Sequence, residues 1–140
     1  MTPSRPIAAS LLPHAEMASE NGNHYADFKV GCVGYGPNGE MFFGANIKPT
    51  PDANPICAEE LVMRQAMAAG VVLEELVVTG VPRKEDTTKT LQGGGERGIP
   101  RMRRRIKEGK AVRPYTHITC VNVLTHDFEE FTVESLIQAH

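Results

Sequence analysis

Residues 56–69 read Ile-Cys-Ala-Glu-Glu-Leu-Val-Met-Arg-Gln-Ala-Met-Ala-Ala, and this stretch decides the fold. Its apolar residues recur at helical spacing and form one broad face, which predicts a helix with a buried side. They are Ala58, Leu61, Val62, Met63, Ala66, Met67 and Ala69. Gly70 follows directly, and glycine is the residue that most often ends a helix. We therefore expect a well-packed helix over residues 56–69.

The segments on either side of this helix have the pattern of strands. Residues 28–35 and 41–47 are rich in valine, glycine and aromatic residues, and they flank the turn Gly36-Pro37-Asn38-Gly39. This arrangement predicts a β-hairpin before the helix. After the helix, short apolar runs over residues 76–80 and 118–124 predict two further strands.

Three more helices are expected, over residues 7–19, 100–109 and 132–139. Residues 82–99 are polar and glycine-rich, which predicts a long flexible loop. Helices and strands alternate after the hairpin, and this order favours an α/β fold, a three-layer α/β/α sandwich. The length of 140 residues predicts a single domain over residues 1–140.

Composition excludes several classes of protein. A net charge of -2 gives no basis for nucleic-acid binding, and no apolar stretch is long enough to cross a membrane. Residues 1–13 lack the pattern of a secretory signal. The three cysteines are widely spaced and odd in number, so we expect no disulfide framework and a cytoplasmic location.

Cys57, Ala58 and Glu59 open the main helix, and their placement suits a specific chemistry. The positive end of a helix dipole stabilises a thiolate, and a thiolate can bind zinc. A glutamate two residues later could move a proton to or from a metal-bound water. Three residues alone are weak evidence, because such short matches are common.

The surroundings of this motif resemble the small zinc-dependent cytidine deaminases. Residues 25–31, Tyr-Ala-Asp-Phe-Lys-Val-Gly, resemble the family's Y-S-x-F-x-V-G stretch. Residues 38–46 resemble its D-G-x-x-x-x-G-x-N hairpin, and residues 131–137 resemble its closing T-V-x-E-L-L helix. The resemblance runs from about residue 8 to 139. It implies the cytidine deaminase type of sandwich with a mixed central sheet, and Glu59 as the acid/base group.

One family motif is changed in a way that bears on zinc. The family's P-C-x-x-C supplies two further thiolates from the next helix, whereas this chain has Pro100, Arg101 and Arg104 at the matching positions. A guanidinium has no lone pair to offer, so neither arginine can bind a metal. Zinc is expected from the family, but the ligands present do not support it. We therefore predict no metal ligands and no cofactor.

The resemblance also implies a pocket for a nucleoside- or nucleotide-like ligand. Its catalytic positions are Cys57 and Glu59. Its ligand-binding positions are Phe28, Asn46, Lys48, Ala58, Arg101 and Arg104. The family's N-x-E pair, which resembles a ribose clamp, has become Asn46-Ile47-Lys48, and the arginine that usually follows C-A-E is Glu60. The pocket loses a carboxylate at position 48 and gains arginines at positions 101 and 104, so it gains positive charge where the family has zinc. We expect Arg101 or Arg104 to reach Glu59 or a bound anion.

Three functions remain open on the sequence. The chain could be a zinc-free binding protein, an enzyme that uses Cys57 as a low-pKa nucleophile, or a true cytidine deaminase with a non-standard metal site. Plainer structural roles compete at each position: Cys57 and Phe28 as core residues, Glu59 as an ordinary first-turn residue, and the arginines as a solvated face. The family's small members also imply a homotetramer or homodimer.

Overall fold

The computed structural model describes residues 4–81 and 95–138, with the side chains of residues 81 and 95–99 left aside. Its elements in chain order are α1 (Pro6–Ser19), β1 (Asn23–His24), β2 (Lys29–Tyr35), β3 (Met41–Ala45), β4 (Ile47–Lys48), α2 (Ala58–Ala69), β5 (Glu75–Val81), α3 (Gly95–Glu108), β6 (His117–Asn122), β7 (Phe128–Thr132) and α4 (Val133–Gln138).

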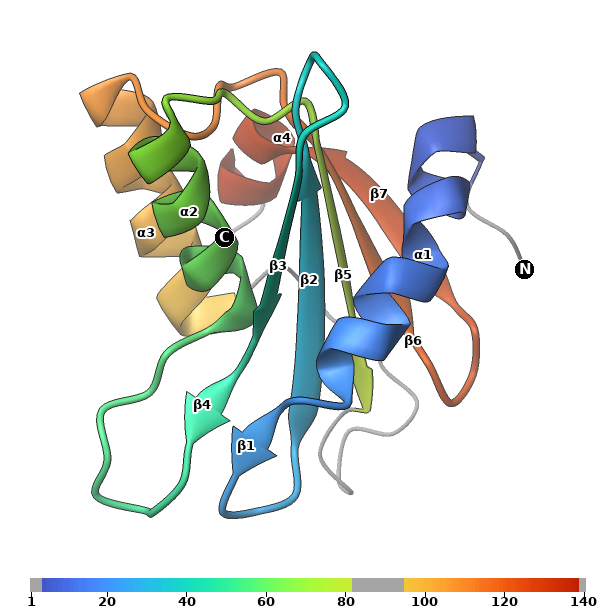
Figure 1. Cartoon of the computed structure of the whole chain (residues 1–140), viewed down its shortest axis with the longest axis vertical. Coiled ribbons are helices and arrows are strands. Elements are labelled where there is room, and N and C mark those ends of the chain that lie inside the picture. The colour runs from blue at the N-terminus through green and yellow to red at the C-terminus, as the bar shows by residue number, and fades with distance from the viewer. Residues whose placement is uncertain (1–3, 82–94, 139–140) are drawn as a thin grey trace.

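The central sheet has the strand order β3-β2-β5-β6-β7. Neighbouring strands are antiparallel, except that β5 and β6 run parallel and are joined through α3. Helix α1 covers one face of the sheet, and α2, α3 and α4 cover the other (Figure 1). The predicted three-layer α/β/α sandwich with a mixed sheet is confirmed.

Alternation along the strands divides the core into two layers. Val33 and Val77 face α1 and pack with its Ala8, Leu11 and Ala15. The intervening residues face α2, and Cys32, Val78 and Cys120 lie in register across β2, β5 and β6 on that side. Two of the three cysteines are thus core residues beneath α2.

Gly44 sets how closely α2 approaches the sheet edge. A Cβ atom at this position would lie 2.4 Å from the carbonyl oxygen of Ala58. Only a glycine allows the first turn of α2 to pack so closely on β3. The start of α2 is therefore fixed against the hairpin, and Gly70 ends the helix in the left-handed conformation as predicted.

Three sequence predictions need correction. Helix α3 begins at Gly95 rather than Pro100, so Pro100 lies inside the helix and not at its first position. Residues 95–99 are therefore helical rather than part of a loop, while residues 82–94 of the predicted loop lie outside the described residues. Strand β7 was not predicted, because Glu129 and Glu130 interrupt the apolar residues by which a strand is recognised in the sequence, as is common in edge strands.

Candidate functional site

The start of α2 is held in place by the short strand before it. Cys57 is the N-cap residue and has extended backbone angles. Immediately before it, Ile56 and Ile47 exchange two backbone hydrogen bonds of 2.9 Å. This pairing anchors the loop between β4 and α2 on the hairpin. As a result Cys57, Glu59 and Glu60 lie on a rigid helix end rather than on a free loop.

Glu59 is a buried carboxyl group without a hydrogen-bond partner. The residue is 1% exposed, and both carboxyl oxygens lack a partner among the residues that the structure describes. Burial raises the pKa of Glu59 to about 7, although the charge of Arg101 opposes part of this rise. The group can therefore exchange a proton near neutral pH, as an acid/base role requires.

Arg101 lies beside the Cys57 thiol. Its Nη1 atom is 3.8 Å from the Cys57 Sγ atom, so the side chain points inward from α3 toward the start of α2. Burial, with a further contribution from the nearby Glu59 carboxylate, raises the pKa of Cys57 to about 12. Burial of Cys57 thus opposes the low-pKa thiolate considered from the sequence, because desolvation outweighs both the helix end and the guanidinium.

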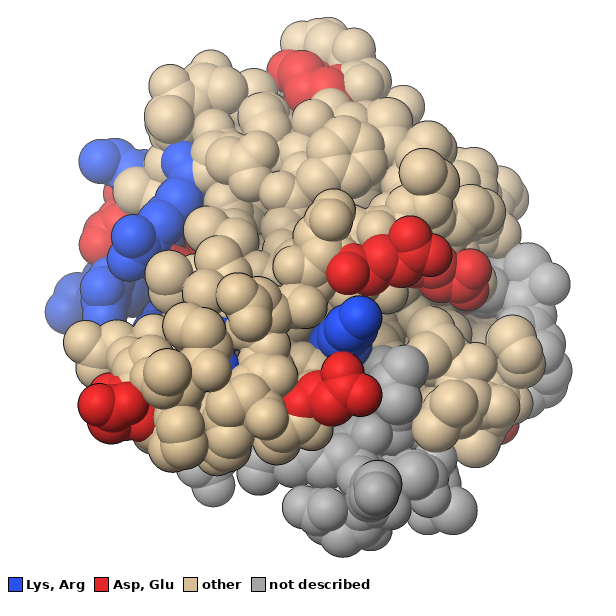
Figure 2. Space-filling view, turned by 60° about the horizontal axis from the view of Figure 1, so that its bottom comes forward, with Lys and Arg blue, Asp and Glu red and all other residues tan. Residues whose placement is uncertain are grey.

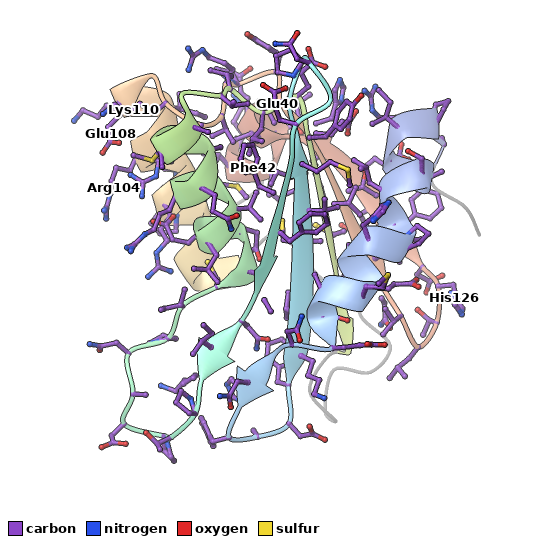
Figure 3. All side chains as sticks on the ribbon, in the orientation of Figure 1. Glu40, Phe42, Arg104, Glu108, Lys110 and His126 are labelled. Atoms are coloured by element: carbon purple, nitrogen blue, oxygen red, sulfur yellow. The ribbon has the colours of Figure 1, made fainter. Side chains whose placement is uncertain are left out.

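Arg104 lies on the outer side of α3. Its side chain is exposed, and Figure 3 shows it pointing away from α2. Arg103, Arg104, Lys107 and Lys110 are all exposed, and Figure 2 shows Lys and Arg gathered at the left edge of the molecule. Of the two substituted positions, the structure brings only 101 to Cys57, and neither arginine hydrogen-bonds Glu59.

A second arginine contact was missed by the sequence analysis. Arg105 Nη2 donates to Glu60 Oε1 at 2.5 Å, and both residues are buried. Glu60 also accepts from the exposed Arg64, and Arg105 also donates to Glu108, each at 3.1 Å. The sequence held one indication of the Glu60–Arg105 contact. The arginine that follows C-A-E in the family is replaced here by Glu60, and a buried glutamate needs a cation as its partner.

The remaining predicted ligand positions have structural partners of their own. Ala58 is fully buried in the core beneath α2, and Phe28 packs against the same cluster. Asn46 accepts a hydrogen bond from the Val30 amide and donates to the Phe28 carbonyl. These contacts give Asn46 a role in holding the start of β2, beside the ligand-binding role that the resemblance implies.

Lys48, in β4, lies in a small cluster with aromatic side chains that come from β1 and the residues after it. Its Nζ donates to the Ala53 carbonyl at 2.9 Å and lies 6.0 Å from the centre of the Tyr25 ring. The rings of His24 and Tyr25 stack, and His24 meets Phe28 edge-on. The cluster places aromatic faces and a cation next to β1 and β4.

Comparison with known families identifies the fold. Residues 7–85 match the family model described as the cytidine and deoxycytidylate deaminase zinc-binding region, which is more than half of the 140-residue chain. The chain belongs to this family. A comparison with curated proteins gives no match. The family match includes Cys57 and Glu59 and ends before Pro100, where this deaminase relative departs from the pattern.

Solved cytidine deaminases share the fold at low identity. The enzyme from Burkholderia pseudomallei is 21% identical with a TM-score of 0.73, covering 91% of this chain and 93% of that one. The enzyme from Bacillus anthracis is 12% identical with a TM-score of 0.64, covering 96% and 89%. The enzyme from Mycobacterium tuberculosis is 18% identical with a TM-score of 0.57, covering 76% and 78%.

Around Cys57, the described residues do not supply the ligands of the zinc ion that the family name implies. A catalytic zinc takes three protein ligands, and the described residues include no group of three or more His, Cys, Asp or Glu side chains that could hold a metal. At one ligand position the Arg101 guanidinium lies against the Cys57 sulfur, and a guanidinium has no lone pair to donate.

No described helix is long and apolar enough to cross a membrane.

Proposed function

We propose that this chain is a zinc-free member of the cytidine deaminase family that does not deaminate cytidine and binds a nucleoside- or nucleotide-like ligand. One observation carries the proposal: the Arg101 guanidinium lies 3.8 Å from the Cys57 sulfur, where the family pattern has a second metal-binding thiolate. A positive group beside Cys57 repels a divalent cation as well as failing to bind it.

The chemistry of deamination supports the same conclusion. Hydrolytic loss of the cytosine amine needs a strongly activated water to attack the ring carbon. Glu59 can accept or donate a proton, but a carboxyl group of pKa about 7 alone does not turn water into a hydroxide nucleophile. Cys57 is a poor substitute nucleophile, because its raised pKa keeps it as a neutral thiol.

Three side chains at the predicted site positions offer groups that suit a small polar ligand. Glu59 offers an unpartnered carboxyl group, and Arg101 offers guanidinium donors from the facing helix. Phe28, half-buried beside His24, supplies an aromatic face. An acceptor, a set of donors and an aromatic ring are the groups that recognise a heterocyclic base.

Two measurements on the purified chain test this function. Cytidine absorbance should stay constant in the presence of the protein, with added zinc as well as without it. Uridine, cytidine and cytidine monophosphate should be titrated by calorimetry, and at least one should bind in a way that Arg101→Gln weakens and the distant, exposed Arg104→Gln does not. Turnover of cytidine that Glu59→Gln abolishes would contradict the proposal, as would the absence of binding by all three probes.

We propose in addition that the chain assembles as a homodimer or homotetramer. Large apolar side chains are exposed on α1, on the edge strand β3 and on β4, namely Met17, Phe43 and Ile47 respectively. They line a groove of about 540 Å³ between α1, β3 and α2. Contiguous exposed apolar surface favours association. Light scattering at micromolar concentration tests this, and a monomeric mass would contradict it.

A further inference from the structure

Two arginines on one side of α3 reach the first turn of α2. Arg101 contacts Cys57, and Arg105, one helical turn later, pairs with Glu60. Residues four apart on a helix share a face, so both contacts come from the same side of α3. They join the same two helices that the family's zinc ion joins through its thiolate ligands.

The Arg105 contact is the stronger of the two. Arg105 is 6% exposed and Glu60 is 2% exposed, and their nitrogen and oxygen atoms are 2.5 Å apart. Glu60 Oε2 and Arg105 Nε have no partner among the described residues, so the pair has a desolvation cost that its hydrogen bonds only partly offset. Because such a pair adds little net stability over apolar residues, its presence between α2 and α3 points to a role in fixing geometry.

The burial of its side chains shows how α3 is rotated about its own axis. Met102 and Arg105 are buried, Arg101 is half-buried toward Cys57, and Arg104 is exposed. In Figure 3, Arg104 and Glu108 lie on the side of α3 away from α2. With this rotation, a side chain at position 104 is directed into solvent and not toward Cys57.

We propose that the buried Glu60–Arg105 pair is a metal-independent clamp, which replaces zinc as the link between α2 and α3 and fixes the rotation of α3 that turns position 104 away from Cys57. The inference rests on the proposed absence of zinc. Metal analysis of the wild-type chain tests that absence separately, whereas the clamp is tested by coupling between two side chains. The two can therefore fail independently.

A double-mutant cycle tests the clamp. Glu60→Met and Arg105→Met should each lower the melting temperature by about 10 °C or more, because each takes away the buried partner of a buried charge, which then keeps only a contact to an exposed side chain. The double variant should recover more than half of that loss, since an apolar pair replaces the ion pair. Arg64→Met is the matched control, because Arg64 also contacts Glu60 but is exposed, and it should change the melting temperature by less than about 3 °C.

All melting temperatures should be the same with and without a chelator. If the single variants do not fold, the test is whether the double variant folds, as the proposed clamp requires. Additive losses, a double variant that is no more stable than the single ones or does not fold, or single variants close to the wild type would overturn the clamp.

The rotation of α3 is tested by restoring the family's cysteines. The variant Arg101→Cys/Arg104→Cys should retain no zinc after incubation with the metal and dialysis, because position 104 faces solvent. Circular dichroism confirms that the variant is folded. Retention of about one zinc per chain, the stoichiometry of a rebuilt three-cysteine site, would show that α3 does not have the proposed rotation.

Discussion

Glu59 and Glu60 are neighbours in the first turn of α2, and both are buried, yet their surroundings differ completely. Glu60 faces α3 and pairs with Arg105, whereas neither Glu59 oxygen has a hydrogen-bond partner in the described part of the chain. Successive residues point about 100° apart around a helix, so the two carboxylates face different neighbours. The comparison separates a buried carboxylate that has a charged partner from a buried carboxyl group that has none among the described residues.

The largest expected effect is on the paired glutamate. Glu60→Gln should lower the free energy of unfolding by ~3–5 kcal/mol, because it removes the buried carboxylate partner of Arg105 and leaves that arginine only the exposed Glu108. Urea denaturation at pH 7 measures this change. A loss below about 1 kcal/mol, the range of an exposed pair, would mean that Glu60 and Glu59 do not differ as described.

The neighbouring substitution should have the opposite sign. Burial raises the pKa of Glu59 from 4.5 to about 7, so the folded state holds a proton that the unfolded chain has lost between these values. The contribution of this group to stability is full below pH 4.5 and is lost as the pH rises to about 7. Glu59→Gln removes the titrating group, and it should therefore stabilise the protein by about 3 kcal/mol at pH 8 and by almost nothing at pH 4.

Urea denaturation at pH 4 and pH 8 checks this difference. Glu60→Gln serves as the control, since its loss of stability should persist at pH 8. A Glu59→Gln variant that is less stable than the wild type at pH 8 would contradict an unpartnered buried carboxylate.

The smallest effect concerns Arg101, which lies beside Cys57 and acts on Glu59 through its charge. Its charge lowers the pKa of Glu59, so Arg101→Gln should move the Glu59 titration to higher pH. Because the guanidinium is only half-buried, the change in unfolding free energy at pH 7 should stay below about 1 kcal/mol. Carbon-detected NMR of the Glu59 carboxyl group follows the titration, and an unchanged or lower pKa would break the proposed link between Arg101 and Glu59.

Much of the sandwich could be predicted from local pattern. The apolar face of residues 56–69 and the turn at residues 36–39 predicted α2 and the β2–β3 hairpin, because periodicity and turn chemistry are local signals. Strand β7 and the first residues of α3 were missed, since the edge strand contains acidic residues and Pro100 suggested a helix start. These features depend on tertiary packing that local pattern does not record.

The site was predictable in part. The motif placed Cys57 and Glu59 at a helix start, and the substituted motif indicated an inward-pointing arginine, which the structure has at position 101. The Glu60–Arg105 pair was not predicted, because it joins residues 45 positions apart and depends on how α3 is rotated. The sequence shows that several arginines occur close together in α3. Which of them is buried depends on how α3 packs against α2, and local pattern does not predict this.

The metal content of the wild-type chain tests the central claim most directly. The protein should be purified without a chelator, incubated with excess zinc, dialysed, and analysed for zinc by mass spectrometry against its measured concentration. A solved cytidine deaminase carrying an intact P-C-x-x-C motif, treated in the same way, is the control. The account predicts that the wild-type chain retains no stoichiometric zinc, because Arg101 and not a thiolate lies beside Cys57. Retention of about one zinc per chain would contradict it.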